Sequence, residues 1–149
     1  MTSGVEPAFI DSNILVYAAV PTAPLHRRAH STLEGLNRSG AVLWVSRQVL
    51  REYLAVLSRP QTFSQPIDAV TLASDIGHFE SRLRVAEDSA AVTRLLLQLL
   101  QQVPIGGKQV HDANIVATMY VHGIRRLLTA NTTDFMRYDH LITVLPLSP

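Results

Sequence analysis

Four acidic residues in separated parts of the chain are candidate ligands for a metal ion: Asp11, Glu52, Asp112 and Asp134. Carboxylates that converge repel one another, and the repulsion is costly unless a cation lies among them. Hard oxygen ligands in a chain without cysteine favour Mg²⁺ or Mn²⁺ over zinc. Such an ion generates a hydroxide from bound water and stabilises in-line attack on a phosphodiester. These residue types are therefore those of metal-dependent phosphodiester chemistry.

Each acid also has a purely structural interpretation, which spacing alone leaves open. Asp112 stands at the start of a predicted helix, where a negative charge interacts favourably with the helix dipole. Asp11 follows a predicted strand, and an aspartate there commonly bonds to the backbone of its own turn. Glu52 lies within a predicted helix and, taken alone, is better interpreted as a solvated surface residue.

The elements that would position these acids alternate between short apolar strands and longer helices. We predict strands over residues 8–11, 41–45, 83–86, 126–129 and 142–145. We predict helices over residues 12–20, 24–37, 47–58, 67–81, 89–103 and 111–122, with a turn or short helix at 134–137. Short, continuously apolar strands separated by helices are typical of a parallel sheet that is buried on both faces.

The expected fold is therefore an α/β three-layer sandwich, with a mostly parallel sheet of about five strands between helices, in a single domain over residues 1–149. In such folds the active crevice lies beyond the carboxyl ends of the strands. Asp11 and Asp134 each follow a predicted strand, so both should open onto the same edge of the sheet. Glu52 and Asp112, which lie on helices, could converge on the same crevice.

Composition agrees with one globular domain: of 149 residues, 47% are hydrophobic and 17% are charged. No apolar run reaches the ~18 residues that a membrane-spanning helix needs. Residues 1–7 show no signal-peptide pattern, so we expect a cytoplasmic protein with no membrane association. The formal net charge is +1, so no overall basic field indicates a nucleic-acid partner.

Four segments resemble the motifs of PIN domains, in matching order and spacing: residues 9–17 (FIDSNILVY), 49–60 (VLREYLAVLSRP), 110–117 (VHDANIVA) and 128–135 (LTANTTDF). Together they cover essentially the whole chain. Within that family the chain resembles the bacterial VapC-type toxins, which are the ribonucleases of type II toxin–antitoxin pairs. The resemblance implies a parallel five-stranded sheet, a Mg²⁺ or Mn²⁺ cofactor, cleavage of RNA, a homodimer and a small antitoxin protein as partner.

The resemblance also assigns roles to the acids. It implies that Asp11, Glu52 and Asp112 form an acidic triad and that Asp134 is the fourth acid. The last motif departs from the pattern, because some members of the family carry an acid where this chain has Asn131. Asn131 and Asp134 are therefore expected to divide the fourth role between them, with Asn131 bonding a water or a phosphate.

Two polar residues follow the first acid. Ser12 and Asn13 resemble the family residues that hold Asp11 or the substrate phosphate. Ordinary turn chemistry explains the same two residues equally well.

Three other classes of protein share parts of this pattern. A phosphorylation receiver needs a lysine near its last strand, whereas the only lysine is Lys108, ahead of a helix. A phosphatase with an aspartyl nucleophile carries a second acid two residues after the strand-end aspartate, where this chain has Asn13. A non-catalytic PIN-like module that only binds partners would keep the fold, and a nuclease assay separates it from the enzyme.

Overall fold

Within residues 4–149, which the computed structural model describes, five short strands form one parallel sheet in the order β3-β2-β1-β4-β5. They are β1 (Ala8–Ile10), β2 (Leu43–Ser46), β3 (Arg84–Ala86), β4 (Arg126–Leu128) and β5 (Thr143–Leu145). In the central strand, Phe9 is paired with Trp44 on one side and Leu127 on the other. All residues of β1 are buried, so both faces of the sheet are covered there. The predicted five-stranded parallel sheet is confirmed.

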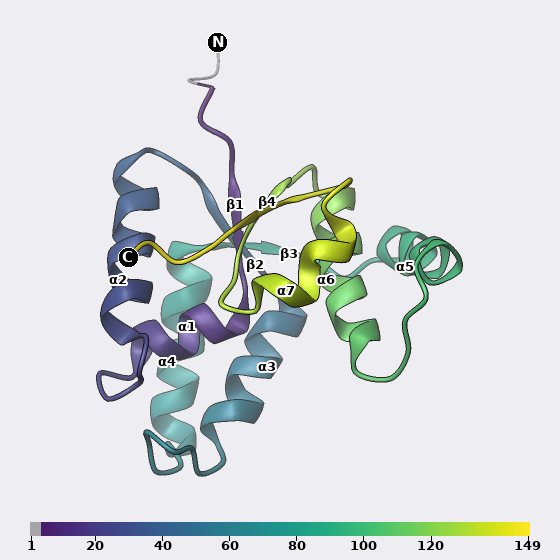
Figure 1. Ribbon diagram of the computed structural model, residues 1–149. Coiled ribbons are helices and arrows are strands. Elements are labelled where there is room, and N and C mark those ends of the chain that lie inside the picture. Colours follow the sequence, from purple (N-terminus) through teal and green to yellow (C-terminus); the bar gives the residue numbers. More distant parts are fainter. Residues whose placement is uncertain (1–3) are drawn as a thin grey trace.

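The helices in the described part of the chain are α1 (Ser12–Ala19), α2 (His26–Arg38), α3 (Arg47–Leu57), α4 (Ala69–Arg82), α5 (Ala90–Gln102), α6 (Gln109–Val121) and α7 (Thr132–Phe135), with a 3-10 helix, η1 (Met136–Tyr138). Figure 1 shows α1, α2 and α4 on one side of the sheet and α5 and α6 on the other. The chain moves from β1 through β2 to β3 in one direction and then returns to β4. Because crossovers between parallel strands are right-handed, this reversal places the later helices on the opposite face. The predicted three-layer sandwich is therefore confirmed.

Some helix boundaries differ from the predicted ones. The predicted helix over residues 67–81 begins at Ala69, because the Asp68 carboxylate caps it by accepting from the backbone N–H of Thr71 at 3.4 Å. The helix predicted from residue 111 begins at Gln109, so Asp112 lies within its first turn. The segment predicted as a turn or short helix at 134–137 is divided between α7 and η1.

The core contains large aromatic side chains, of which Phe9, Tyr53 and Tyr138 are fully buried. The outer faces of α5 and α6 keep some apolar side chains exposed, notably Leu97 at 52% and Tyr120 at 40%. No helix among residues 4–149 is both long enough and apolar enough to cross a membrane.

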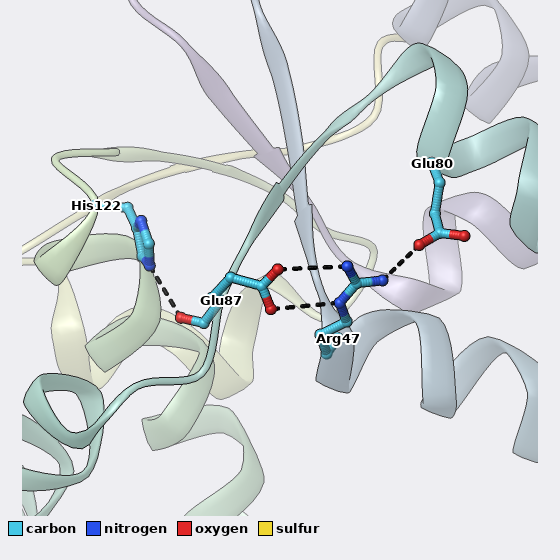
Figure 2. Close-up of polar contacts among 4 residues, drawn as sticks. All are labelled: Arg47, Glu80, Glu87 and His122. Carbon is cyan, nitrogen blue, oxygen red and sulfur yellow. Dashed lines mark hydrogen bonds and ion pairs between the residues drawn. The ribbon is translucent and has the colours of Figure 1, made fainter.

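A network of ion pairs fixes the start of α3, the helix that carries Glu52. Arg47, the first residue of α3, contacts Glu80 of α4 and donates to both carboxylate oxygens of Glu87, at 3.3 and 3.4 Å (Figure 2). The backbone carbonyl of Glu87 also accepts from Nε2 of His122 at 3.0 Å. Exposed ion pairs contribute about 0–1 kcal/mol each, so the network adds little to the stability of the fold.

Candidate active site

The candidate site lies at the carboxyl ends of β1 and β4, which are neighbours in the sheet. In the sheet, β1 has β2 on one side and β4 on the other, and the chain continues from β1 to β2. Ligands of open α/β sheets bind at such a reversal of strand order. Asp11 directly follows β1, and its backbone N–H donates to the carbonyl of Leu128 in β4 at 3.0 Å. The first acid therefore lies where the fold forms a crevice.

Asp11 is held in place by neutral hydrogen-bond donors. Its Oδ1 accepts from the backbone N–H of Ser12 at 2.8 Å, which makes Asp11 the N-cap of α1. Its Oδ2 accepts from the Thr129 hydroxyl at 2.7 Å and from the Asn13 amide at 3.2 Å. Burial raises the pKa of Asp11, which is only 5% exposed. The charge of Glu52 raises that pKa further, while the hydrogen bonds oppose the rise.

Asn13 connects α1 to the loop that follows β4. Its amide nitrogen lies 3.4 Å from the hydroxyl of Thr129, and its Oδ1 accepts from the backbone N–H of Ala130 at 3.1 Å. The Thr129 hydroxyl oxygen in turn accepts from the backbone N–H of Asn131 at 3.0 Å. One asparagine side chain thus contacts both Asp11 and the loop that carries Asn131.

Glu52 is half-buried on α3 and is bonded to a buried amide one turn earlier. Its carboxylate accepts from Nε2 of Gln48 at 3.3 Å. The same amide group of Gln48 donates to the backbone carbonyl of His111 at 2.9 Å, and its Oε1 accepts from Nδ2 of Asn114 at 2.8 Å. Gln48 therefore links Glu52 to α6, the helix that carries Asp112.

The charges of the other three acids act on Asp112. The pKa of Asp112 is raised to about 6, first by partial burial and then by the charges of Asp11, Asp134 and Glu52. The positive charge of Arg137 acts in the opposite direction. The acids that act on Asp112 come from three separate segments of the chain, and Asp11, Glu52 and Asp112 line one cleft.

A cleft of about 270 Å³ opens beside these groups, and its polar wall consists of Asp11, Ser12, Asn13, Glu52, Asp112 and Asn131. Asp134 is exposed on α7 and does not line the cleft, although its charge acts on Asp112. The two residues that share the expected fourth role thus have different positions. The amide of Asn131 lies at the cleft wall, and the carboxylate of Asp134 lies outside it.

The donor set at the cleft fits a hard divalent cation. Asp11, Glu52 and Asp112 supply carboxylate groups, and Mg²⁺ and Mn²⁺ prefer oxygen ligands of this kind. The hydrogen bonds that hold Asp11 and Glu52 come from neutral groups, so they leave the negative charge uncompensated. As they stand, no three His, Asp or Glu side chains of residues 4–149 are close enough to hold one ion together. A cation bound among these carboxylates would relieve their mutual repulsion.

Two residues that support the site, Gln48 and Thr129, are missing from the sequence prediction. A signal exists for Gln48: it precedes Glu52 by four residues, a spacing that places both on the same side of a helix. Thr129 is the polar residue at the end of the predicted strand over residues 126–129, directly before a turn. Its role depends on the pairing of β4 with β1, which the sequence does not specify.

Comparisons with known proteins match the chain over most of its length. Residues 8–141 match the family model of the PIN domain. Ribonuclease VapC48 of Mycobacterium tuberculosis is 24% identical over 131 residues, which cover 87% of this chain and 90% of that protein. The structure of VapBC2 from Rickettsia felis, bound to a promoter DNA fragment, aligns with a TM-score of 0.66 and 25% identity over 95% of this chain and 98% of that chain. The structure of VapC20 of Mycobacterium tuberculosis, a toxin that cleaves the sarcin–ricin loop, aligns with a TM-score of 0.60 and 19% identity over 80% of this chain and 86% of that chain.

Proposed function

The chain belongs to the PIN domain family, and from this premise we propose that it is a metal-dependent ribonuclease that cuts RNA internally. The observation that carries the proposal is the cleft that Asp11, Glu52 and Asp112 line together. The pKa of Asp112, raised first by burial and then by the charges of Asp11, Asp134 and Glu52, agrees with it. Crowded carboxylates at the carboxyl edge of a parallel sheet suit a divalent cation and a phosphodiester substrate. The names of two relatives, one a ribonuclease and one an RNA-cleaving toxin, support RNA as that substrate.

In this proposal Asp11, Glu52 and Asp112 hold Mg²⁺ or Mn²⁺, and Asp134 adds negative charge from α7. When bound there, the cation supplies a Lewis acid for the charge that develops on the scissile phosphate. Gln48 orients the carboxylate of Glu52 through its hydrogen bond at 3.3 Å. The raised pKa of Asp112 means that this carboxyl group holds a proton more readily than an ordinary aspartate until positive charge arrives.

The remaining polar groups of the cleft orient the carboxylate of Asp11 and the substrate phosphate. Thr129 and Asn13 fix the carboxylate of Asp11 at one rotamer, since both bond to the same oxygen. Ser12 and Asn131 lie at the cleft wall and carry no negative charge, so they are suited to bond the oxygens of a substrate phosphate.

We further propose that the chain is the toxin of a type II toxin–antitoxin pair, with an antitoxin protein as partner, and that it acts in the cytoplasm as a homodimer. The toxin named among its structural neighbours supports the first part. The exposed apolar side chains on α5 and α6, including Leu97 and Tyr120, offer a surface for a two-fold interface.

The activity is tested by incubating the purified protein with RNA in Mg²⁺ or Mn²⁺ and in EDTA. We expect cleavage only with the divalent ion, and nearly complete loss in Asp11→Asn and Asp112→Asn. Asp139→Asn, the same chemical change at an exposed aspartate after η1, is the matched control and should cut like the wild type. Full cleavage by Asp11→Asn in EDTA would refute the assignment. A folded wild type that binds RNA and metal without cutting would identify a non-catalytic binding module instead.

A further inference from the structure

The cleft that holds the acids continues into an end with a different chemistry. Beyond the polar wall it is lined by Val16 and Tyr17 of α1, by Val56 of α3, and by Gln61 and Phe63 of the loop after α3. No acidic residue lies among these five. We call them the apolar end of the cleft. A substrate bound at the acids would therefore meet apolar and aromatic surface within the same cavity.

Two of the five residues at the apolar end are aromatic. The rings of Tyr17 and Phe63 lie with their centroids 6.3 Å apart and their planes at 66°, an edge-to-face arrangement. Both side chains are only half-buried. Edge-to-face rings do not stack on each other, and both side chains are partly exposed at the cleft, which leaves aromatic surface open to a third flat group.

The loop that carries Phe63 is held in place by hydrogen bonds. Gln61 and Ser64 form a two-way backbone bridge, with N···O distances of 2.8 and 3.4 Å. The side chain of Gln61 donates to the carbonyl of Val56 at 2.8 Å, and the hydroxyl of Thr22 donates to the carbonyl of Phe63 at 2.5 Å. A ligand that binds to this loop would therefore lose little free energy in ordering it.

Helix α1 sets the separation between Asp11 and Tyr17. Asp11 caps α1, and Tyr17 is six residues further along, a rise of about 9 Å at about 1.5 Å per residue. Asn13, which contacts Asp11, and Tyr17 are four residues apart and so share one side of the helix. This places Tyr17 fewer than two helical turns from Asp11 along α1, and both residues line the same cleft.

We propose that Tyr17 and Phe63 form a stacking subsite for one unpaired nucleobase of the RNA, next to the phosphate that is cut. This inference rests on the proposed ribonuclease function. The acids and the two rings line one cleft, so a base next to an RNA phosphate held at the acids can reach the apolar end. Single-stranded RNA is commonly recognised by aromatic side chains that stack on splayed-out bases, and such stacking accepts any base because every base has a flat face.

The subsite is tested by a double-mutant cycle between Phe63 and the base. The probe is a fluorescein-labelled 12-nucleotide unpaired RNA centred on a cut that the protein makes in the activity assay, with one abasic nucleotide placed at successive positions. Affinity is measured by fluorescence anisotropy in Ca²⁺, with the RNA checked by gel to be intact. Phe63→Leu keeps apolar bulk without an aromatic face, and Phe63→Tyr restores the face. Phe79→Leu is the matched control, because Phe79 is a half-buried aromatic residue on α4 outside the cleft.

For the wild type, an abasic nucleotide at one or two positions beside the cut should raise Kd about 5- to 150-fold, the range expected for one stacked base. Phe63→Leu should raise Kd by a similar factor for the intact RNA and show no further loss at those positions. Phe63→Tyr and Phe79→Leu should behave like the wild type. Thermal melts of each variant establish that it is folded.

The outcomes separate this inference from the proposed function. If the wild type cuts no RNA with Mg²⁺ or Mn²⁺, the proposed function fails. If it cuts RNA but the losses from Phe63→Leu and the abasic nucleotide simply add, or Phe79→Leu matches Phe63→Leu, the stacking subsite is wrong. If Phe63→Leu binds RNA like the wild type but loses affinity for a protein partner, the apolar end is a protein-binding surface and the proposal is overturned.

Discussion

Replacing Asp112 with asparagine should stabilise the metal-free protein while it abolishes activity. The pKa of Asp112 is about 6 in the fold, against an ordinary value of 3.8. A folded-state pKa above the unfolded one means that ionisation opposes folding. The destabilisation is fully present above about pH 6. It fades as the pH falls towards 3.8, below which the carboxyl group is protonated in both the folded and the unfolded chain. Asparagine cannot ionise, so it removes this pH-dependent term.

The size of the effect follows from the same pKa. The difference between the pKa of about 6 in the fold and the ordinary value of 3.8 corresponds to about 3 kcal/mol, at about 1.4 kcal/mol for each pKa unit. Asp112 is only half-buried, and screening by solvent reduces this to roughly 1–2 kcal/mol. The variant also loses a favourable interaction with the dipole of α6, which costs about 0.3–1 kcal/mol. A net gain of about 1 kcal/mol raises the melting temperature by about 2–4 °C for a domain of this size.

The assay is a set of thermal melts of wild type and Asp112→Asn in EDTA at pH 7.5 and pH 4, and with added Mg²⁺ at pH 7.5. The variant should melt higher at pH 7.5 in EDTA, and the advantage should disappear at pH 4. Added Mg²⁺ should raise the wild-type melting temperature by mass action and that of the variant much less. Asp139→Asn controls for the loss of one negative charge. If Asp112→Asn melts lower in EDTA and both proteins respond equally to Mg²⁺, Asp112 is structural and the metal site is wrong.

Three further changes probe the supports of the site and its assembly. Gln48→Leu removes the hydrogen bond to Glu52 and leaves partly buried partners unsatisfied, so it should lower the free energy of unfolding by about 1 kcal/mol. It should also weaken Mn²⁺ binding measured by calorimetry, and unchanged Mn²⁺ affinity would make Gln48 merely structural. Thr129→Val removes a hydrogen bond that lowers the pKa of Asp11, so the acid limb of the activity profile should move to higher pH, and an unmoved profile would contradict this reasoning. Leu97→Glu should shift light scattering from dimer to monomer if α5 forms the interface, whereas a wild type that is monomeric at micromolar concentration would remove the dimer proposal.

The sequence predicts the sheet well because each strand is a short apolar run whose burial leaves little choice of structure. Residues 8–11 and 126–129 are examples: β1 and β4 occupy them to within one residue at the carboxyl end. Asp11 directly follows β1, and Asp134 comes after β4. Because the carboxyl ends of parallel strands lie at one edge of the sheet, both acids are expected near that edge. Boundaries that depend on a cap are less predictable, as at Asp68, because many polar residues can start a helix.

The supporting contacts of the site are less predictable because they join residues that are distant in the sequence. The hydrogen bond from Thr129 to Asp11 spans 118 positions, and that from Asn114 to Gln48 spans 66. Such contacts depend on the order and register of the strands, which local patterns do not specify. Phe63 lies in a loop without periodicity, so nothing local in the sequence relates it to the acids.

The way in which the acids are bonded leads us to expect that stability and metal affinity oppose each other at the proposed metal site. Neutral donors such as Thr129 and Gln48 fix the direction of a carboxylate but leave its charge in place. The ion pairs found within residues 4–149 are made by Arg47 and His30 with other acids, and none includes the four acids of the site. Besides burial, which is the main cause of the raised pKa of Asp112, repulsion from the other acids raises it, and a bound cation would relieve that repulsion. If a cation binds as proposed, it relieves a repulsion that contributes to weakening the metal-free fold. We therefore expect that a substitution that stabilises this fold by removing one of the four acids also weakens metal binding.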